Sequence, residues 1–397
     1  MSLKSHLQMS TPPTMSFQTL PLDTLRTRHS NKWNRFDDDV IPAWVADMDF
    51  ALAPPIRECL ASALERHDFG YPIYARNDPL PQVFSQRMQE RFDWSPDPEG
   101  VVLITDVVQG FYVSFDRLLA PGDGVVVNTP LYPPILQGIA ETGRRLVRNP
   151  LRPLDEGWAL DVDALARCID EGTRALVLCN PHNPSGRVFT RQELDAVASL
   201  ARQHDLIVLA DEIHADLIYP GASHIPFATL SADAARRTVT FTSTTKAFNT
   251  AGLRCAIAHF GSPELKARFQ EFSPRFRGGL VAYGAEVTRV AWQQCQGWLD
   301  EALVYLQGNR DLIARTVAER MPGVRHVAPQ STYLAWLDFN DLKLNRDPHA
   351  FFLEKARVGL SEGPTFGEEG QGCARVNFAT DRAVLQEILD RMVAALA

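Results

Sequence analysis

Short apolar runs alternate with helical patterns from about residue 79 to residue 262 of the chain. The runs span residues 101–104, 125–128, 175–180, 206–211, 239–243 and 256–261. Continuous apolar runs of this length are typical of strands that are buried on both faces of a mostly parallel sheet. Between two of these runs, Thr190 and Glu193 form a capping-box pattern that predicts the start of a helix. The alternation therefore indicates an α/β fold with helices on both sides of the sheet.

The C-terminal part of the chain follows a different pattern. Residues 332–339 and 375–379 are expected to form strands, and helical patterns lie near residues 348–358 and 381–396. A long helical stretch near residues 281–320 would link this part to the large sheet. We therefore predict a flexible N-terminal arm over residues 1–24, a large domain over residues 65–300, and a smaller α+β domain formed by residues 25–64 and 301–397.

Composition narrows the classes of function. The 397-residue chain is 45% hydrophobic and has a net charge of −8, with scattered lysines and arginines, so we expect no nucleic-acid partner. No apolar run is long enough to cross a membrane, and the first 20 residues lack the apolar core of a signal peptide. Six cysteines without a CxxC spacing predict reduced thiols rather than disulfides. We therefore expect a cytoplasmic protein with no membrane contact.

Polar residues follow three of the predicted strands, where ligands bind in open α/β sheets. Two Asn-Pro pairs after residues 175–180 keep the backbone extended and would fix the side chain of Asn183, although an ordinary turn explains this loop equally well. Asp211 ends the next run and needs a cationic or donor partner, but alone it is more often a helix cap or part of a structural ion pair. Lys246 follows the run 239–243 within a hydroxyl-rich turn.

The chemistry of Lys246 depends on that turn. A lysine that is desolvated near cationic groups has a lowered pKa and becomes nucleophilic toward an aldehyde. Hydroxyls and turn amides bind phosphate oxygens, and Arg254 would add a bidentate contact. With Asn183 and Asp211, the loops offer a reactive amine, a phosphate cradle, a partner for a pyridine nitrogen and a fixed amide. This combination predicts pyridoxal 5'-phosphate (PLP), held by Lys246 as a Schiff base.

The order of the motifs NPHNPSG, DEIHADL, STTKAFN and GLR resembles that of the fold-type I PLP enzymes of the class I/II aminotransferase superfamily. The longer strings WVADMDF at residues 44–50 and TYLAWLD at residues 332–338, together with GYP at residues 70–72, resemble the MalY/PatB group of cystathionine β-lyases. The resemblance covers nearly the whole chain from about residue 25. It implies a PLP-dependent transferase-like large domain and a smaller α+β domain.

The resemblance also implies a role for each residue of the site. Lys246 holds the cofactor and moves the proton of the substrate Cα, and Asp211 pairs with the pyridine nitrogen. Asn183 and His214 lie near the 3'-oxygen of the ring. Arg375 binds the carboxylate of the substrate through two hydrogen bonds. The remaining cofactor contacts are the stacking Tyr132, the phosphate ligands Ser243, Thr245, Val107, Val108 and Arg254, and Tyr71, which reaches the cofactor of a neighbouring subunit.

Two residues depart from the pattern of the lyase group. Arg254 stands where that group often has a neutral residue, whereas many aminotransferases have arginine there. Asp106 stands where a glycine is common. Because a carboxylate beside a phosphate is unfavourable, we expect Asp106 to point away from the phosphate site.

The resemblance favours a lyase that cleaves L-cystathionine or related cysteine S-conjugates to a thiol, pyruvate and ammonia. An aminotransferase is the alternative, since the same residues serve both reactions, and a transcriptional regulator that acts by binding a protein is a lesser one. The ten histidines form no metal-binding spacing and no GxSxG occurs, so we expect neither a metal nor a serine hydrolase. The implied partners are a small amino-acid substrate and a second copy of the chain, in a homodimer with shared active sites.

Overall fold

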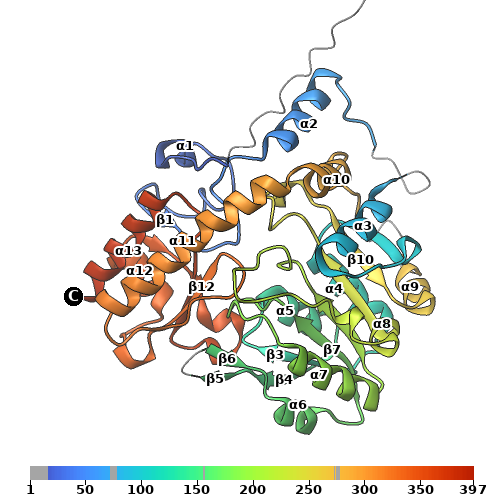
Figure 1. Ribbon diagram of the computed structural model, residues 1–397. Helices are drawn as coiled ribbons and strands as arrows, with labels where there is room; N and C mark the ends of the chain where they lie inside the picture. The colour runs from blue at the N-terminus through green and yellow to red at the C-terminus, as the bar shows by residue number, and fades with distance from the viewer. Residues whose placement is uncertain (1–16, 72–77, 155–156, 272, 274–277) are drawn as a thin grey trace, which may run out of the picture.

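The computed structural model describes residues 17–71, 78–154, 157–271, 273 and 278–397 (Figure 1). Residues 1–16 of the predicted N-terminal arm lie outside the described residues. The rest of the arm packs on the body: the ring of Phe17 lies 4.7 Å from that of Phe50, and helix α1 (Leu22–Arg26) buries Leu25. The part of the predicted arm that the structure describes, from residue 17 onward, therefore packs on the body.

A seven-stranded sheet, in the order β2-β10-β9-β8-β7-β3-β4, forms the centre of the larger part. Strand β10 is antiparallel to both of its neighbours, and the other pairs are parallel. The bounds are β2 Val101–Ile104, β3 Gly124–Thr129, β4 Arg145–Pro150, β7 Thr173–Cys179, β8 Ile207–Asp211, β9 Thr238–Thr242 and β10 Ala256–Phe260. The mostly parallel α/β sheet predicted from the apolar runs is confirmed.

Helices cover both faces of this sheet, which explains why the strands are apolar throughout. Val125 and Val127 of β3 belong to the core on one face, and Val126 between them belongs to the core on the other face. The predicted capping box is present, because Thr190 and Glu193 satisfy each other's backbone at the start of α7. The helices of this part are α3 Leu80–Phe92, α4 Val107–Leu118, α5 Pro133–Glu141, α6 Val162–Cys168, α7 Arg191–Gln203, α8 Ala232–Arg237 and α9 Pro263–Gln270.

The smaller part is built on a four-stranded sheet in the order β11-β12-β15-β14. Helix α11 (Gln296–Arg320) runs from α10 (Gly284–Gln294) to this part, and α2 (Pro54–Glu65) projects from the body beside α10 (Figure 1). The remaining elements are β11 Arg325–His326, β12 Leu334–Asp338, β14 Ser361–Glu362, β15 Cys373–Asn377, α12 Pro348–Lys355, α13 Arg382–Leu396, the pair β1 Ile41–Pro42 and β13 Val358–Gly359, and the hairpin β5 Arg152–Leu154 and β6 Gly157–Ala159.

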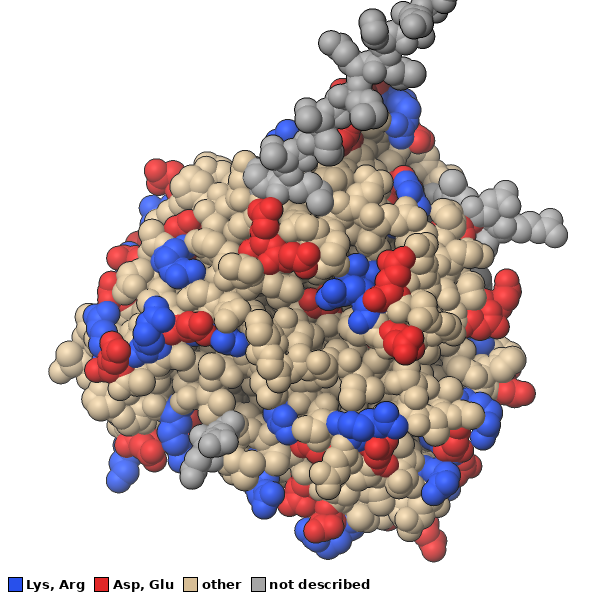
Figure 2. All heavy atoms as spheres, viewed as in Figure 1, with Lys and Arg blue, Asp and Glu red and all other residues tan. Residues whose placement is uncertain are grey.

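Acidic and basic side chains are interspersed on the face shown in Figure 2. Several of them form ion pairs, such as Arg320 with Asp390 at 2.5 Å. Among the described residues, none of the helices combines the length and the apolar character that a membrane crossing requires. All six cysteines are free, and four of them are buried.

Candidate active site

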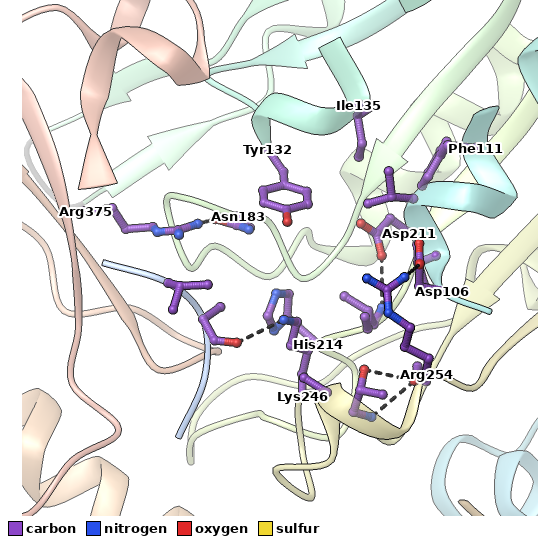
Figure 3. Close-up of a pocket in the computed structure, with 18 residues that line it drawn as sticks. Asp106, Phe111, Tyr132, Ile135, Asn183, Asp211, His214, Lys246, Arg254 and Arg375 are labelled. Carbon is purple, nitrogen blue, oxygen red and sulfur yellow. Dashed lines mark hydrogen bonds and ion pairs between the residues drawn. The ribbon is translucent and has the colours of Figure 1, made fainter. Parts of the chain in front are cut away.

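The carboxyl ends of three neighbouring strands bring the predicted residues together. Cys179, the last residue of β7, pairs with Asp211 on β8, and Asp211 pairs with Phe241 on β9. The loops that follow these strands therefore start side by side at one edge of the sheet. They line a cavity of about 380 Å³, which also receives residues from the N-terminal segment, from the start of α4 and from β15 (Figure 3). This volume suits a small organic ligand.

Lys246 projects into this cavity from the turn after β9. Its Nζ donates a hydrogen bond to the carbonyl oxygen of Ala46 at 2.9 Å. Burial lowers the pKa of the amine, and the neighbouring guanidinium of Arg375 lowers it further, whereas the carboxylate of Asp47 opposes the shift. A lowered pKa increases the fraction of neutral amine, which is the form that attacks an aldehyde.

Asp211 is buried in the wall of the cavity with no cationic side chain bonded to it among the described residues. Its Oδ1 accepts a hydrogen bond from the backbone N–H of Ile213 at 3.2 Å, and the Sγ of Cys179 lies 3.9 Å from its Oδ2. Burial raises the pKa of this carboxyl to about 6. A buried carboxylate without a cationic partner would be stabilised by a cationic atom of a ligand in the cavity.

Arg375 projects from β15 and is 4% exposed. It donates hydrogen bonds to Asn183 Oδ1 at 2.8 Å, and to the carbonyl of Trp44 and the hydroxyl of Ser361 at 3.1 Å each. Burial lowers the pKa of its guanidinium to about 10. All three partners are neutral, so within the described part of the chain this buried cation lacks a counter-ion. It is therefore suited to bind a carboxylate.

His214 and Tyr132 also line the cavity (Figure 3). Burial lowers the pKa of His214 to about 3, so its imidazole is neutral. Its Nδ1 is buried and has no hydrogen-bond partner among the described residues, as is also true of the Nε of Arg375. Buried polar atoms of this kind usually have partners, so both fit a polar ligand in the cavity.

One end of the cavity is lined by the start of α4 and by hydroxyl groups. Asp106 caps the helix, because its Oδ1 accepts from the backbone N–H of Gln109 at 2.8 Å. The first backbone N–H groups, those of Val107 and Val108, have no partner within the helix and bind anions well. The hydroxyls of Ser243 and Thr245 lie 3.0 Å apart at the same end. These groups fit the phosphate of PLP.

The expectation that Asp106 points away from this end is wrong. Its side chain lines the cavity, and its Oδ2 lies 2.7 Å from Nη1 of Arg254, so the two departures from the family pattern form one ion pair. The guanidinium neutralises the carboxylate, which removes the reason for Asp106 to turn away. Arg254 has a positive φ of 39°, an uncommon backbone conformation for a residue other than glycine.

Tyr71 does not contribute to the cavity of its own chain. Its side chain is 96% exposed, and the six residues that follow it, 72–77, lie outside the described residues. Its role in the site of a neighbouring subunit therefore stays a prediction.

Ala46 and Tyr333 are among the contributors to the site that the sequence analysis missed. Ala46 supplies a backbone carbonyl to Lys246, and Tyr333 donates its hydroxyl to the same carbonyl at 3.2 Å. Both lie in strings that carry the family resemblance, WVADMDF and TYLAWLD. A string of this kind identifies a family, but it does not show which backbone atom faces the lysine.

The fold is an α/β fold whose cavity contains a lysine close to the end of a strand. The family model described as "Aminotransferase class I and II" matches residues 79–392. The chain belongs to this family and, within it, to the MalY/PatB group. The resemblance inferred from the motifs is therefore confirmed.

Two curated relatives cover nearly the whole chain. The chain is 36% identical over 377 residues to a cystathionine beta-lyase of Corynebacterium glutamicum, covering 94% of this chain and 99% of that protein. It is 34% identical over 376 residues to the cystathionine beta-lyase PatB of Bacillus subtilis, covering 93% of this chain and 97% of the relative.

Solved structures with the same fold are similar to this chain over nearly its whole length. A putative PLP-dependent β-cystathionase from Corynebacterium diphtheriae is 34% identical with a TM-score of 0.90, and the match covers 96% of this chain and 99% of the other. OvoB is 38% identical with a TM-score of 0.89, and the match covers 93% and 96% of the two chains.

Proposed function

We propose that the protein is a PLP-dependent carbon–sulfur β-lyase that cleaves L-cystathionine or related cysteine S-conjugates to a thiol, pyruvate and ammonia. The observation that carries the proposal is the placement of three groups in one cavity. These are the amine of Lys246, the carboxylate of Asp211 and the guanidinium of Arg375, which has no counter-ion among the residues that the structure describes. The functions named for the relatives support the choice of reaction.

The chain's own residues divide the work of this reaction. When bound, PLP supplies an electron sink that stabilises negative charge at the substrate Cα. Arg375 binds the carboxylate of the amino acid and so fixes the direction of its Cα–H bond. Lys246 takes the proton from Cα as a general base, after which a thiolate leaves from Cβ. Asp211 stabilises positive charge on the ring nitrogen of the cofactor, which keeps the sink effective.

The alternative is an aminotransferase, in which Lys246 returns the proton to the cofactor. Arg254 was the feature that favoured this alternative. Its charge is paired with Asp106, so Arg254 does not offer an unpaired cation to the site. The lyase is therefore the better-supported reaction.

Incubation with L-cystathionine and no keto acid tests the reaction directly. We expect pyruvate, ammonia and a free thiol to form in equal amounts and over many turnovers. Pyruvate is measured with a coupled dehydrogenase and the thiol with a chromogenic disulfide. Stoichiometric conversion of the bound cofactor to pyridoxamine phosphate, without free thiol, would instead establish the aminotransferase.

A homodimer with shared active sites is part of the proposal. Leu64 and Phe69 are 64% and 63% exposed, and Tyr71 beside them is 96% exposed. They lie on α2 and on the segment that follows it, which projects from the body (Figure 1). Exposed apolar residues that are clustered in this way are typical of a protein interface.

Mixing two inactive variants tests whether the sites are shared. Tyr71→Ala removes the residue that crosses to the neighbour, and Lys246→Ala removes the reactive amine. In a hybrid dimer, one site combines the intact Lys246 of one subunit with the intact Tyr71 of the other. We therefore expect each variant alone to be nearly inactive and an equimolar refolded mixture to recover about a quarter of the wild-type rate. No recovery, with hybrids shown by native mass spectrometry, would refute the shared site.

We propose a cytoplasmic location because all six cysteines are free. Thiols are maintained in a reducing compartment, whereas disulfides form in oxidising ones.

A further inference from the structure

The carbonyl of Ala46 holds two donors at once. It accepts from Nζ of Lys246 at 2.9 Å and from the hydroxyl of Tyr333 at 3.2 Å. A backbone carbonyl has two lone pairs, so these two bonds use its whole capacity. Tyr333 is 1% exposed, and burial holds the pKa of its phenol well above the ordinary value, so the hydroxyl acts only as a neutral donor or acceptor.

The peptide that carries this carbonyl is held firmly on both sides. Nδ2 of Asn377 donates to the carbonyls of Val45 and Asp47, at 2.6 and 2.7 Å. The Nζ of the buried Lys32 also donates to the carbonyl of Asp47 at 3.1 Å. The two flanking carbonyls therefore have partners away from the lysine, and the carbonyl of Ala46 alone is directed to Lys246 and Tyr333.

The backbone around Tyr333 is fixed as well, and the residue before it is strained. Thr332 has a positive φ of 68°, which is a true outlier for a β-branched residue. Its carbonyl accepts from the hydroxyl of Tyr219 at 2.6 Å, and the carbonyl of Tyr333 accepts from the N–H of Phe378 at 2.9 Å. Strain of this kind persists only where the surroundings enforce it, and here it precedes the residue that reaches the shared carbonyl.

We propose that Tyr333 is a positioning residue for the amine of Lys246 and that it acts through the shared carbonyl of Ala46. While a substrate occupies the cofactor, the lysine is free, and this carbonyl holds its amine at the place from which it moves the Cα proton. Tyr333 fixes the direction of the carbonyl. The inference rests on the proposed function only in using Lys246 as the base, which the lyase and the aminotransferase share.

The test is the exchange of the Cα hydrogen of L-alanine with deuterated solvent, followed by proton NMR. Alanine has no leaving group at Cβ, so exchange reports proton movement by Lys246 and not thiol release. We expect Tyr333→Phe to slow the exchange about ten-fold, because a misplaced base loses rate steeply. The KM for alanine and the affinity for PLP should stay close to their wild-type values. The rate at which cofactor-free protein captures PLP, seen in its visible absorbance, should fall as well.

Tyr305→Phe is the control. Tyr305 lies on α11, outside the cavity lining, and its hydroxyl accepts a hydrogen bond from the backbone N–H of Arg382 at 2.6 Å. We expect this variant to lose some stability and to keep the wild-type exchange rate. Incorporation of 4-aminophenylalanine at position 333, which retains an N–H donor, should restore most of the exchange.

Three outcomes would overturn the proposal. These are wild-type exchange in Tyr333→Phe, an equal loss in Tyr305→Phe, and no restoration by the amino analogue. If the wild-type protein exchanges the Cα hydrogen of alanine but releases no thiol from L-cystathionine, the proposed lyase function fails while the role of Tyr333 stays testable.

Discussion

Replacing Lys246 by alanine should abolish turnover, with a loss of about 10⁴-fold or more, while the protein stays folded. A general base of this kind contributes about 10²–10⁴-fold, and in the proposed function Lys246 also attaches the cofactor covalently. The side chain lines a cavity, so its removal opens space without breaking the core. Pyruvate formation from L-cystathionine measures the loss, and the visible absorbance of protein saturated with PLP measures the attachment.

A surface lysine provides the control for this variant. Lys355 has a side chain that is 57% exposed and forms an ion pair with the adjacent Glu354, so Lys355→Ala should leave rate and absorbance unchanged. Reduction of the wild-type protein with borohydride should fix the cofactor on the peptide that contains Lys246, as mass spectrometry would show. Attachment to another lysine, or normal turnover in Lys246→Ala, would contradict the assignment.

The sequence predicted the strands that carry the site because those strands are buried on both faces. A run such as residues 175–179 has no polar alternation, and it leads directly to the loop at the sheet edge that carries Asn183. Strand β4 was not predicted. Its exposed positions include Arg145 and Arg148, since it lies at the edge of the sheet, and the apolar signal is therefore absent.

The site could be predicted as a set of residues but not as a set of contacts. Side chains such as Asp211 and Lys246 have a chemistry that the sequence reveals. The ion pair of Asp106 with Arg254 joins residues 148 positions apart, and each seemed anomalous when considered alone. The contact between Lys246 and Ala46 uses a backbone atom, which every residue has, so no residue type could indicate it.

Replacing Asp211 by asparagine should have opposite effects on catalysis and on the stability of the cofactor-free protein. The carboxylate is buried, and removing one partner of a buried ion pair costs about 3–5 kcal/mol, so we expect turnover to fall by at least about 10²-fold. The affinity for PLP should fall too. In the wild-type protein this affinity should decline as the pH drops below about 6, where Asp211 takes up a proton in the cofactor-free protein, and the variant should lack that decline.

The stability of the cofactor-free protein should change in the other direction. Burial raises the pKa of Asp211 from 3.8 to about 6. The contribution of this carboxyl to the free energy of unfolding is therefore fully present only below about pH 4, the pKa in the unfolded chain, and it is lost as the pH rises through about 6. At neutral pH the buried charge then costs on the order of 2–3 kcal/mol. Asp211→Asn should therefore raise the free energy of unfolding by up to about that amount at pH 7.5, and by little at pH 4.

The adjacent carboxylate gives the control for both effects. Glu212 is 4% exposed, lies outside the cavity lining, and accepts hydrogen bonds from Phe227 N at 3.0 Å and His224 Nε2 at 3.1 Å. Because these bonds satisfy its charge, Glu212→Gln should lower the stability and leave the pH dependence of PLP affinity intact. Denaturant unfolding of the cofactor-free variants at about pH 7.5 and about pH 4 distinguishes the effect of Asp211→Asn from that of Glu212→Gln. A loss of stability in Asp211→Asn at pH 7.5 would show that this carboxylate serves the fold rather than the cofactor.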